Sequence, residues 1–201
     1  MDLRVTADNV IVVMHDAAVD RTTNGKGLVS SFLLRDLLLL DAAHHWPQYK
    51  GTRVPMLAEV FERLPKMRMN LEMKQFTPAQ AEALCAQVKR AGMEHKVLVA
   101  AFGDAPVHAF RRACPAVATA MTASEARSFA VVSRTYRLPA PGLEIPDGIA
   151  DLSAAARRRN VKLYLFTVND EKRMRELIEA GVAGIITDRP DLLKTISASY
   201  R

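Results

Sequence analysis

The chain has 201 residues, of which 49% are hydrophobic and 25% are charged, so it can bury the core of a globular domain. No apolar run reaches the roughly 18 residues that a membrane-spanning helix needs. A formal net charge of +6 would suit a nucleic-acid binder, but the basic residues are scattered and no nucleic-acid-binding motif accompanies them. A mildly basic protein also suits an anionic small molecule. The composition therefore argues against nucleic acid and against a transmembrane segment.

Two cysteines, Cys85 and Cys114, fall within helical patterns, and neither belongs to a CxxC pair. This placement predicts two buried free thiols in a reducing compartment and argues against a zinc or redox role. The start of the sequence also lacks the basic segment and apolar stretch of a signal peptide. We therefore predict a cytoplasmic location.

Strand and helix patterns alternate along most of the chain. Alternating or short apolar runs predict strands at residues 3–6, 10–14, 67–74, 97–102, 116–120, 138–145, 161–168 and 184–187. Amphipathic patterns and capping signals predict helices at residues 31–41, 55–64, 77–92, 104–113, from 122, 149–159, 169–181 and from 189 onward. Capping boxes mark two of the helix starts, at Thr77 with Gln80 and at Thr122 with Glu125.

The order of these elements is βα repeated about seven times with short connections, which predicts parallel strands with helices outside. A closed barrel and an open doubly wound sheet both satisfy this order. No glycine-rich fingerprint follows an early strand, which weakens a dinucleotide-binding sheet. No linker or low-complexity segment divides the chain, so we expect a single domain over residues 1–201.

Polar residues at the ends of the first predicted strands are candidates for chemistry, because barrel active sites form at the carboxyl ends of strands. Strand alternation places Asp2 on the same face as Arg4 and Thr6. His15 directly follows a buried apolar strand, where a histidine can act as general acid or base near neutral pH. A strand-end histidine bonded to a loop carbonyl is the structural alternative.

The segment Asn70-Leu71-Glu72-Met73-Lys74 carries a second candidate set. A period of two puts Asn70, Glu72 and Lys74 on one face of the strand. A carboxylate and an ammonium group at a strand end suit a cation and a phosphate respectively, whereas an internal salt bridge explains the same spacing. The spacing leaves both interpretations open.

The ends of the last two predicted strands carry Asn169 and Asp188. Asn169 is predicted first of all to be the N-cap of the next helix. Asp188, which precedes Arg189-Pro190, is a residue type that can cap the final helix. Neither position by itself indicates catalysis.

Six segments resemble, in the same order, motifs of the glycerophosphodiester phosphodiesterase family. The first runs from an acidic strand through a turn to a His-Asp pair, and the fourth is the family's Glu-x-Lys strand. Each match alone is weak, but six in order identify the chain as a member over essentially its whole length. The segments are residues 2–16, 21–27, 54–60, 70–74, 166–169 and 184–190.

The resemblance implies a (β/α)8 barrel of the TIM type that binds one divalent cation, Mg²⁺ or Ca²⁺. It assigns Asp2 and Glu72 to the metal, in keeping with the preference of hard cations for carboxylate oxygens. It assigns acid–base catalysis to His15, and phosphate or substrate contacts to Lys74 and Phe166. The implied reaction hydrolyses a small-molecule glycerophosphodiester to glycerol 3-phosphate and an alcohol, in phospholipid and glycerol metabolism.

The sequence departs from the family at its start. The family's first strand, which carries a His-Arg pair, and the helix after it have no counterpart, and the glutamate of its Glu-x-Asp pair would precede Met1. We therefore expect a TIM-type barrel that lacks its first strand and helix, and one of its two catalytic histidines. Phe166 also stands where the family usually has tryptophan. A catalytically dead fragment or a phosphate-binding barrel remnant is the alternative function, and the oligomeric state stays open.

Overall fold

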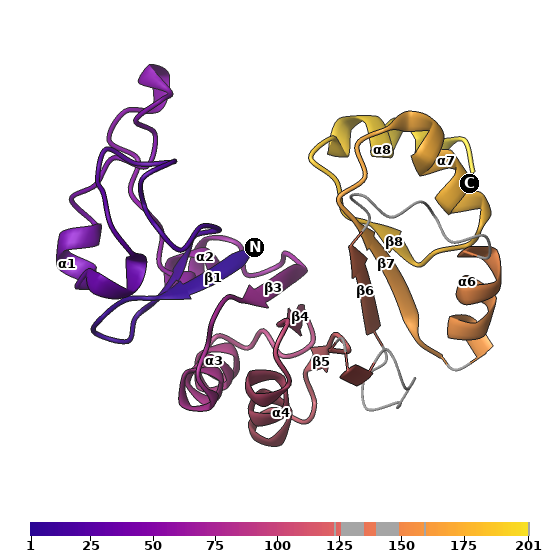
Figure 1. Ribbon diagram of the computed structural model, residues 1–201, viewed down its shortest axis with the longest axis horizontal. Helices are drawn as coiled ribbons and strands as arrows, with labels where there is room; N and C mark the ends of the chain where they lie inside the picture. The colour runs from indigo at the N-terminus through magenta and orange to yellow at the C-terminus, as the bar shows by residue number, and fades with distance from the viewer. Residues whose placement is uncertain (123, 126–134, 140–148, 159, 201) are drawn as a thin grey trace. The chain divides into compact units, whose positions relative to one another are not determined.

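The computed structural model describes the chain apart from residues 123, 126–134, 140–148, 159 and 201. The chain divides into two compact units, Met1–Thr122 and Ala123–Arg201. Figure 1 draws the first unit from indigo to rose and the second from brown to yellow. In the described part of the chain no helix is long and apolar enough to cross a membrane.

The first unit is built on a five-stranded sheet in the order β2-β1-β3-β4-β5. Neighbours among β1, β3, β4 and β5 pair in parallel, as the βα pattern predicts. The five strands are β1 (Asp2–Val5), β2 (Ile11–Val13), β3 (Met69–Met73), β4 (Val97–Ala100) and β5 (Ala118–Thr119).

Strand β2 departs from that pattern, because it pairs antiparallel with β1 and places Val13 opposite Leu3. Too few residues separate the two strands for the crossover that parallel pairing requires, which takes a dozen or more. Asn9 adopts the left-handed conformation, with φ of 62°, and lets the chain turn back at once. The expectation of parallel pairing is therefore wrong for this strand.

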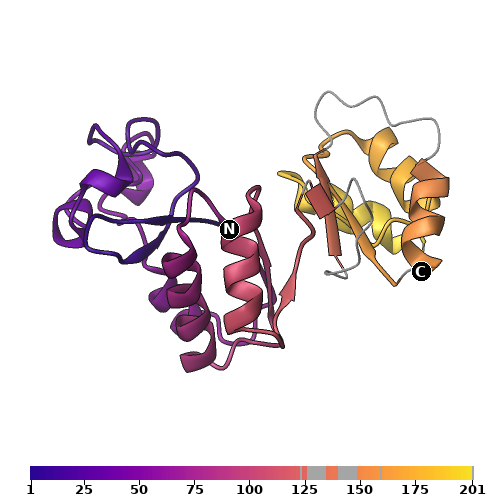
Figure 2. The ribbon, with the colours of Figure 1, turned by 60° about the horizontal axis from the view of Figure 1, so that its bottom comes forward.

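Helices α2 (Leu57–Arg63), α3 (Pro78–Arg90) and α4 (Asp104–Ala113) follow the predicted pattern. Helix α3 starts in the predicted capping box, in which Thr77 Oγ1 accepts a hydrogen bond from Gln80 N at 3.3 Å and Gln80 Oε1 accepts one from Thr77 N at 2.9 Å. Helices α3 and α4 lie side by side (Figure 2) and cover the core of the sheet. Fully buried members of that core include Leu3, Leu71, Leu84, Val99 and Phe110.

The helix predicted at residues 31–41 is much shorter than expected. The segment forms a short 3-10 turn (Val29–Ser31) and the single-turn helix α1 (Leu34–Leu37), and a second 3-10 turn (Pro47–Tyr49) follows it. Asp41 N donates to Asn24 Oδ1 at 2.8 Å, so the chain bonds to a neighbouring loop there instead of extending the helix. Tertiary hydrogen bonds thus override the local pattern.

A disulfide joins Cys85 on α3 to Cys114 at the end of α4. Both sulfur-bearing residues are buried, with 2% and 1% exposure. The expectation of two free thiols is therefore wrong. Packing of α3 on α4 brings the two Cα atoms to 5.7 Å, within the range for a disulfide, although 29 positions separate them in sequence. The predicted cytoplasmic location stays a prediction and loses its argument from free thiols.

The second unit has a three-stranded parallel sheet in the order β6-β7-β8, with the register Leu165 beside Ile185. Its elements are β6 (Thr135–Pro139), α6 (Ile149–Arg158), β7 (Lys162–Phe166), α7 (Glu171–Glu179), β8 (Gly184–Ile185) and α8 (Pro190–Ala198). Most of the strand predicted at 138–145, and residue 123 of the predicted capping box, lie outside the described residues. The parallel pairing agrees with the βα pattern.

The start of α7 differs from the prediction. Asp170 caps it by accepting a hydrogen bond from Arg173 N at 2.8 Å, one residue after the predicted cap Asn169. Asn169 instead joins the ends of β7 and β8: its Oδ1 accepts from Thr187 Oγ1 and Asp188 N, both at 2.9 Å. Helix α8 has no side-chain cap: its N-cap residue is Arg189, and Asp188 Oδ2 accepts from Asn169 Nδ2 at 2.9 Å.

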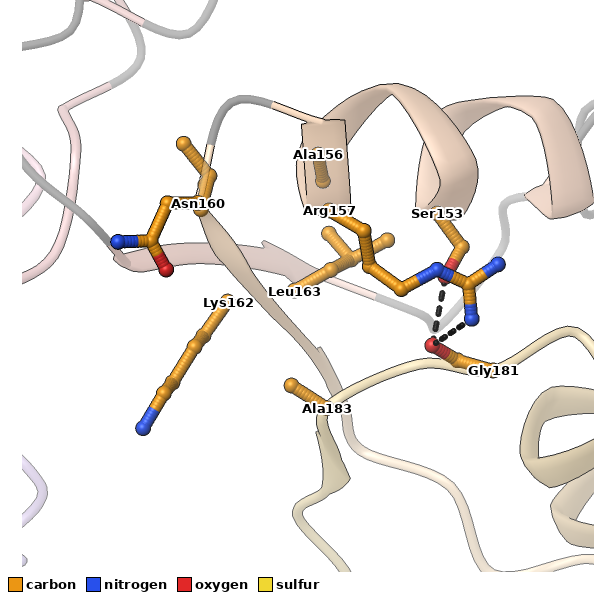
Figure 3. A pocket seen from close by; sticks show the side chains of 9 residues that line it. Ser153, Ala156, Arg157, Asn160, Lys162, Leu163, Gly181 and Ala183 are labelled. Atoms are coloured by element: carbon orange, nitrogen blue, oxygen red, sulfur yellow. Dashed lines mark hydrogen bonds between the residues drawn. The ribbon is translucent and has the colours of Figure 1, made fainter.

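A pocket at the amino ends of β7 and β8 has a structural role (Figure 3). Ser153 Oγ of α6 donates to the carbonyl oxygen of Gly181 at 2.7 Å, and Arg157 Nη1 donates to the same oxygen at 3.4 Å. These bonds fasten α6 to the turn that precedes β8. The pocket lies at the ends of the strands opposite to those where barrel active sites form.

Candidate functional site

Three charged side chains meet on adjacent strands of the first sheet. Asp2 on β1 stands beside Glu72 on β3 in the parallel register. Lys74 Nζ lies 2.6 Å from Glu72 Oε1 and 3.5 Å from Asp2 Oδ1. Alternation along β3 puts Glu72 and Lys74 on one face, as the sequence indicated. The structure thus brings Asp2, Glu72 and Lys74 together.

The three side chains differ in exposure. The Glu72 side chain is 8% exposed, Lys74 is 17% exposed and Asp2 is 31% exposed. A buried carboxylate is stable only when a cation or hydrogen bonds compensate its charge. Lys74 supplies that compensation for Glu72, so the internal salt bridge considered from the spacing is present. The cluster still opens to solvent on the side of Asp2.

The donor atoms of this cluster suit a hard divalent cation. Carboxylate oxygens are the ligands that Mg²⁺ and Ca²⁺ prefer, and Asp2 and Glu72 supply them from paired strand positions. Asn70 precedes Glu72 by two positions on β3, and its Oδ1 is buried without a hydrogen-bond partner among the described residues. Within that described part, no three histidine, cysteine, aspartate or glutamate side chains form a complete metal site. The chemistry of these residues fits a cation, with ligand positions left for water or substrate.

His15 belongs to a second charged group at the end of β2. Its Nδ1 lies 2.7 Å from Asp16 Oδ1, and Arg21 holds the same carboxylate through Nε and Nη2 at 2.6 Å and 3.0 Å. The hydrogen bonds from Arg21 first, and from His15 second, hold the pKa of Asp16 well below its usual range. The partner of the His15 ring is thus a carboxylate, rather than the loop carbonyl considered above.

This arrangement sets which nitrogen of His15 can exchange a proton. An ionised carboxylate can only accept hydrogen bonds, so Nδ1 of His15 must carry the proton that it shares with Asp16. The other ring nitrogen, Nε2, is then the basic one in the neutral imidazole. The His15 side chain is 64% exposed, which leaves it accessible to a bound molecule.

Arg4 is a site residue that the sequence analysis did not select. Its Nε and Nη2 donate to the carbonyl oxygen of His15 at 3.1 Å and 2.8 Å, and its Nη1 donates to Gln75 Oε1 at 2.8 Å. Burial lowers the pKa of Arg4, and the charges of Asp16, Asp2 and Glu72 oppose that shift. Arg4 therefore links His15, two residues beyond the end of β2, to Gln75, which follows Lys74. The strand alternation that puts Arg4 on the same face as Asp2 was the sequence feature that could have identified Arg4 as a site residue.

Phe166, the remaining predicted site residue, ends β7 in the second unit and is partly exposed. Near it, Asn169 and Asp188 form the hydrogen-bonded link between strand ends described above. Its assignment to substrate binding stays a prediction.

Comparison with known proteins identifies the family of this chain. The model of the glycerophosphoryl diester phosphodiesterase family matches residues 1–192. A glycerophosphodiester phosphodiesterase of Caldanaerobacter subterraneus is 32% identical, over 96% of this chain and 82% of the relative. One from Bacillus subtilis is 29% identical, over 100% of this chain and 76% of the relative.

Solved structures agree with these matches. A glycerophosphodiester phosphodiesterase from Agrobacterium tumefaciens superposes with a TM-score of 0.83 at 27% identity, over 97% of this chain and 85% of that one. An Oleispira antarctica phosphodiesterase, solved with the product sn-glycerol-3-phosphate, has a TM-score of 0.82 at 21% identity, over 98% of this chain and 83% of that one. At that identity, the second likeness concerns the fold alone.

The predicted fold class, an α/β barrel of the TIM type, is confirmed by these structures together with the parallel strands and outer helices seen here. The family match covers nearly the whole chain and includes both charged groups of the site. The chain therefore belongs to the glycerophosphoryl diester phosphodiesterase family, a family of phosphoric diester hydrolases.

Proposed function

We propose that this protein hydrolyses glycerophosphodiesters to sn-glycerol 3-phosphate and an alcohol, as part of phospholipid and glycerol metabolism, and that residues 1–201 act as one catalytic domain. The observation that supports this most is the meeting of Asp2, Glu72 and Lys74 on adjacent strands. The His15–Asp16 pair follows the neighbouring strand β2. The names of the relatives agree with this reaction.

Asp2 and Glu72 hold one divalent cation, Mg²⁺ or Ca²⁺, through their carboxylate oxygens. When bound there, the cation offsets the negative charge of the phosphodiester and lowers the pKa of an attacking hydroxyl group or water. The observations in favour are the paired register of the two carboxylates and the hard oxygen donors, to which buried Asn70 Oδ1 adds a neutral one.

Lys74 binds the phosphate, because its ammonium group ends the same strand face as Glu72 and is partly open to solvent. His15 moves a proton at Nε2, to or from the reacting oxygen. Asp16 keeps the proton of the ring on Nδ1, and Arg21 keeps Asp16 ionised. Phe166 contacts the substrate from the end of β7.

The direct test measures release of sn-glycerol 3-phosphate from glycerophosphodiesters by the purified protein, with Mg²⁺, with Ca²⁺ and with a chelator. Glu72→Gln keeps the shape of the side chain but removes its charge, and we expect it to lower the rate at least about 100-fold. Glu62→Gln, at an exposed position of α2, is the matched control and should keep the rate of the parent. Full activity of Glu72→Gln would contradict the assignment.

A phosphate-binding protein without catalysis is the second candidate. The observation that favours it is the salt bridge itself, since Lys74 already compensates Glu72 at 2.6 Å without a cation. This candidate predicts binding of sn-glycerol 3-phosphate, measured by calorimetry, together with no release of product in any metal. Metal-dependent turnover excludes it.

A further inference from the structure

A loop of residues 42–52, here called the aromatic loop, stands away from the first sheet and has no part in the proposed reaction. Figure 1 draws its 3-10 turn, Pro47–Tyr49, in purple at the top of the first unit. Ala42 N donates to Thr52 O at 2.7 Å, which closes the base of the loop. Ala43 is buried beside that bond, at 6% exposure. The base is therefore fixed to the folded unit, and the tip is presented to solvent.

Two aromatic side chains lie at the surface of this tip. Trp46 is 61% exposed and Tyr49 is 64% exposed, although the backbone between them is held by the hydrogen bond from Tyr49 N to Trp46 O at 2.8 Å. Among the described residues, neither the indole nitrogen of Trp46 nor the hydroxyl group of Tyr49 has a hydrogen-bond partner. Rings with one polar end are amphipathic, and Trp and Tyr gather where water meets lipid. Both side chains thus suit the headgroup layer of a lipid surface.

The tip of the aromatic loop also carries positive charge. Residues 44–53 include Lys50 and Arg53, both exposed, and contain no aspartate or glutamate. Two carboxylates adjoin the base: Asp41 Oδ1 accepts from two backbone N–H groups of the loop at 3.0 Å and 3.1 Å, and Glu59 Oε1 lies 3.9 Å from Arg53 Nη2. Glu59 offsets part of the charge of Arg53, whereas Lys50 has no ion pair within the described part of the chain. Basic residues beside aromatic ones are attracted to anionic lipid.

We propose that the aromatic loop docks this protein on an anionic phospholipid surface. Trp46 and Tyr49 enter the headgroup layer, and Lys50 and Arg53 contact lipid phosphates. Aromatic residues are common at protein–protein interfaces too, but lysine is depleted there, so the charge of the tip favours lipid. The inference goes beyond the proposed function, and its test needs no turnover of substrate.

The chain contains a single tryptophan, so the fluorescence of Trp46 reports directly on this loop. The test adds vesicles to the full chain and follows both the emission of Trp46 and co-sedimentation. One set of vesicles is pure phosphatidylcholine, and the other is phosphatidylcholine mixed with phosphatidylglycerol. We expect a blue shift of the emission and co-sedimentation with the mixed vesicles only. Both should weaken as salt is added, because salt screens the attraction between charges.

Variants at the basic residues test the charge. Lys50→Gln combined with Arg53→Gln should lower the affinity for mixed vesicles about 30-fold. Lys66→Gln combined with Arg68→Gln is the matched control, since these residues are also exposed and lie between α2 and β3. This control should stay within about threefold of the parent, because charges away from the contact are screened.

A second pair of variants tests the aromatic side chains. Tyr49→Ala should lower the affinity for mixed vesicles about tenfold, through loss of apolar burial. Met67→Ala is its control, since Met67 is a large apolar residue that is 54% exposed outside the loop, and it should bind as the parent does.

Four outcomes would overturn the proposal. The first is the absence of both blue shift and co-sedimentation with the mixed vesicles. The second is equal binding to the two kinds of vesicle. The third is an equal loss of affinity in the two double variants, since the net charge alone would then explain the attraction. The fourth is a parent that binds no vesicle but sediments as a dimer, which Tyr49→Ala converts to a monomer; the loop would then join two copies of this chain.

Discussion

Reduction of the Cys85–Cys114 disulfide should destabilise the first unit by a predictable amount. The bond closes a loop with a sequence separation of 29. For a loop of that length, the chain-entropy description gives a stabilisation of about 3.6 kcal/mol at 25 °C, or roughly 400-fold in the unfolding equilibrium. The bond also holds α3 to α4, whose packing covers most of the core. Its loss is therefore expected to affect the unit as a whole.

The assay is urea unfolding, followed by circular dichroism, with and without a thiol reductant. Reductant is the cleaner perturbation, because it leaves both sulfur atoms in the core, where each residue is at most 2% exposed. The double variant Cys85→Ala, Cys114→Ala serves as control and should not respond to reductant. It should be less stable than the reduced parent, because it also leaves cavities.

Two results would refute this reasoning. The first is an unchanged urea midpoint after reduction, which would mean that the bond contributes nothing to stability. The second is the titration of two free thiols in protein unfolded without reductant. That result would restore the interpretation of the two cysteines as separate buried thiols.

Further predictions concern single side chains. Asp16→Asn should lower the rate of diester hydrolysis about 10- to 100-fold, because the ring of His15 loses the carboxylate that orients it; an unchanged kcat would refute this role. Since the pKa of Asp16 is depressed in the folded state, its contribution to stability is present above about pH 4 and is lost as the pH falls further. In acid unfolding, the parent should therefore lose more stability below about pH 4 than Asp16→Asn does. Thr77→Ala should cost about 1 kcal/mol of stability in urea unfolding through loss of the α3 cap, whereas Thr195→Ala, exposed within α8, should cost less. Arg4→Met should lower kcat more than Arg4→Lys does, while Arg35→Met, exposed on α1, should leave it unchanged.

Local features of the sequence determined a good part of this protein. The alternation along β3 predicted that Glu72 and Lys74 share a face, and the two side chains are in contact. The capping box at Thr77 predicted the start of α3. Both signals act within a few residues of one another. The order of βα units and the six motifs likewise predicted the fold class and the family.

Contacts between residues far apart in sequence were decided only by the tertiary structure. Cys85 and Cys114 pair because α3 packs on α4, and no spacing rule states that in advance. Arg4 bonds both to the carbonyl of His15 and to Gln75, because β1 lies between β2 and β3 in the sheet. Gln75 lies 71 positions after Arg4 in the sequence. Helix α1 ends at Leu37, and Asp41, which the sequence placed in the same helix, bonds to Asn24 of another loop. Local propensity gives small energies per residue, whereas packing and long-range hydrogen bonds depend on which surfaces meet.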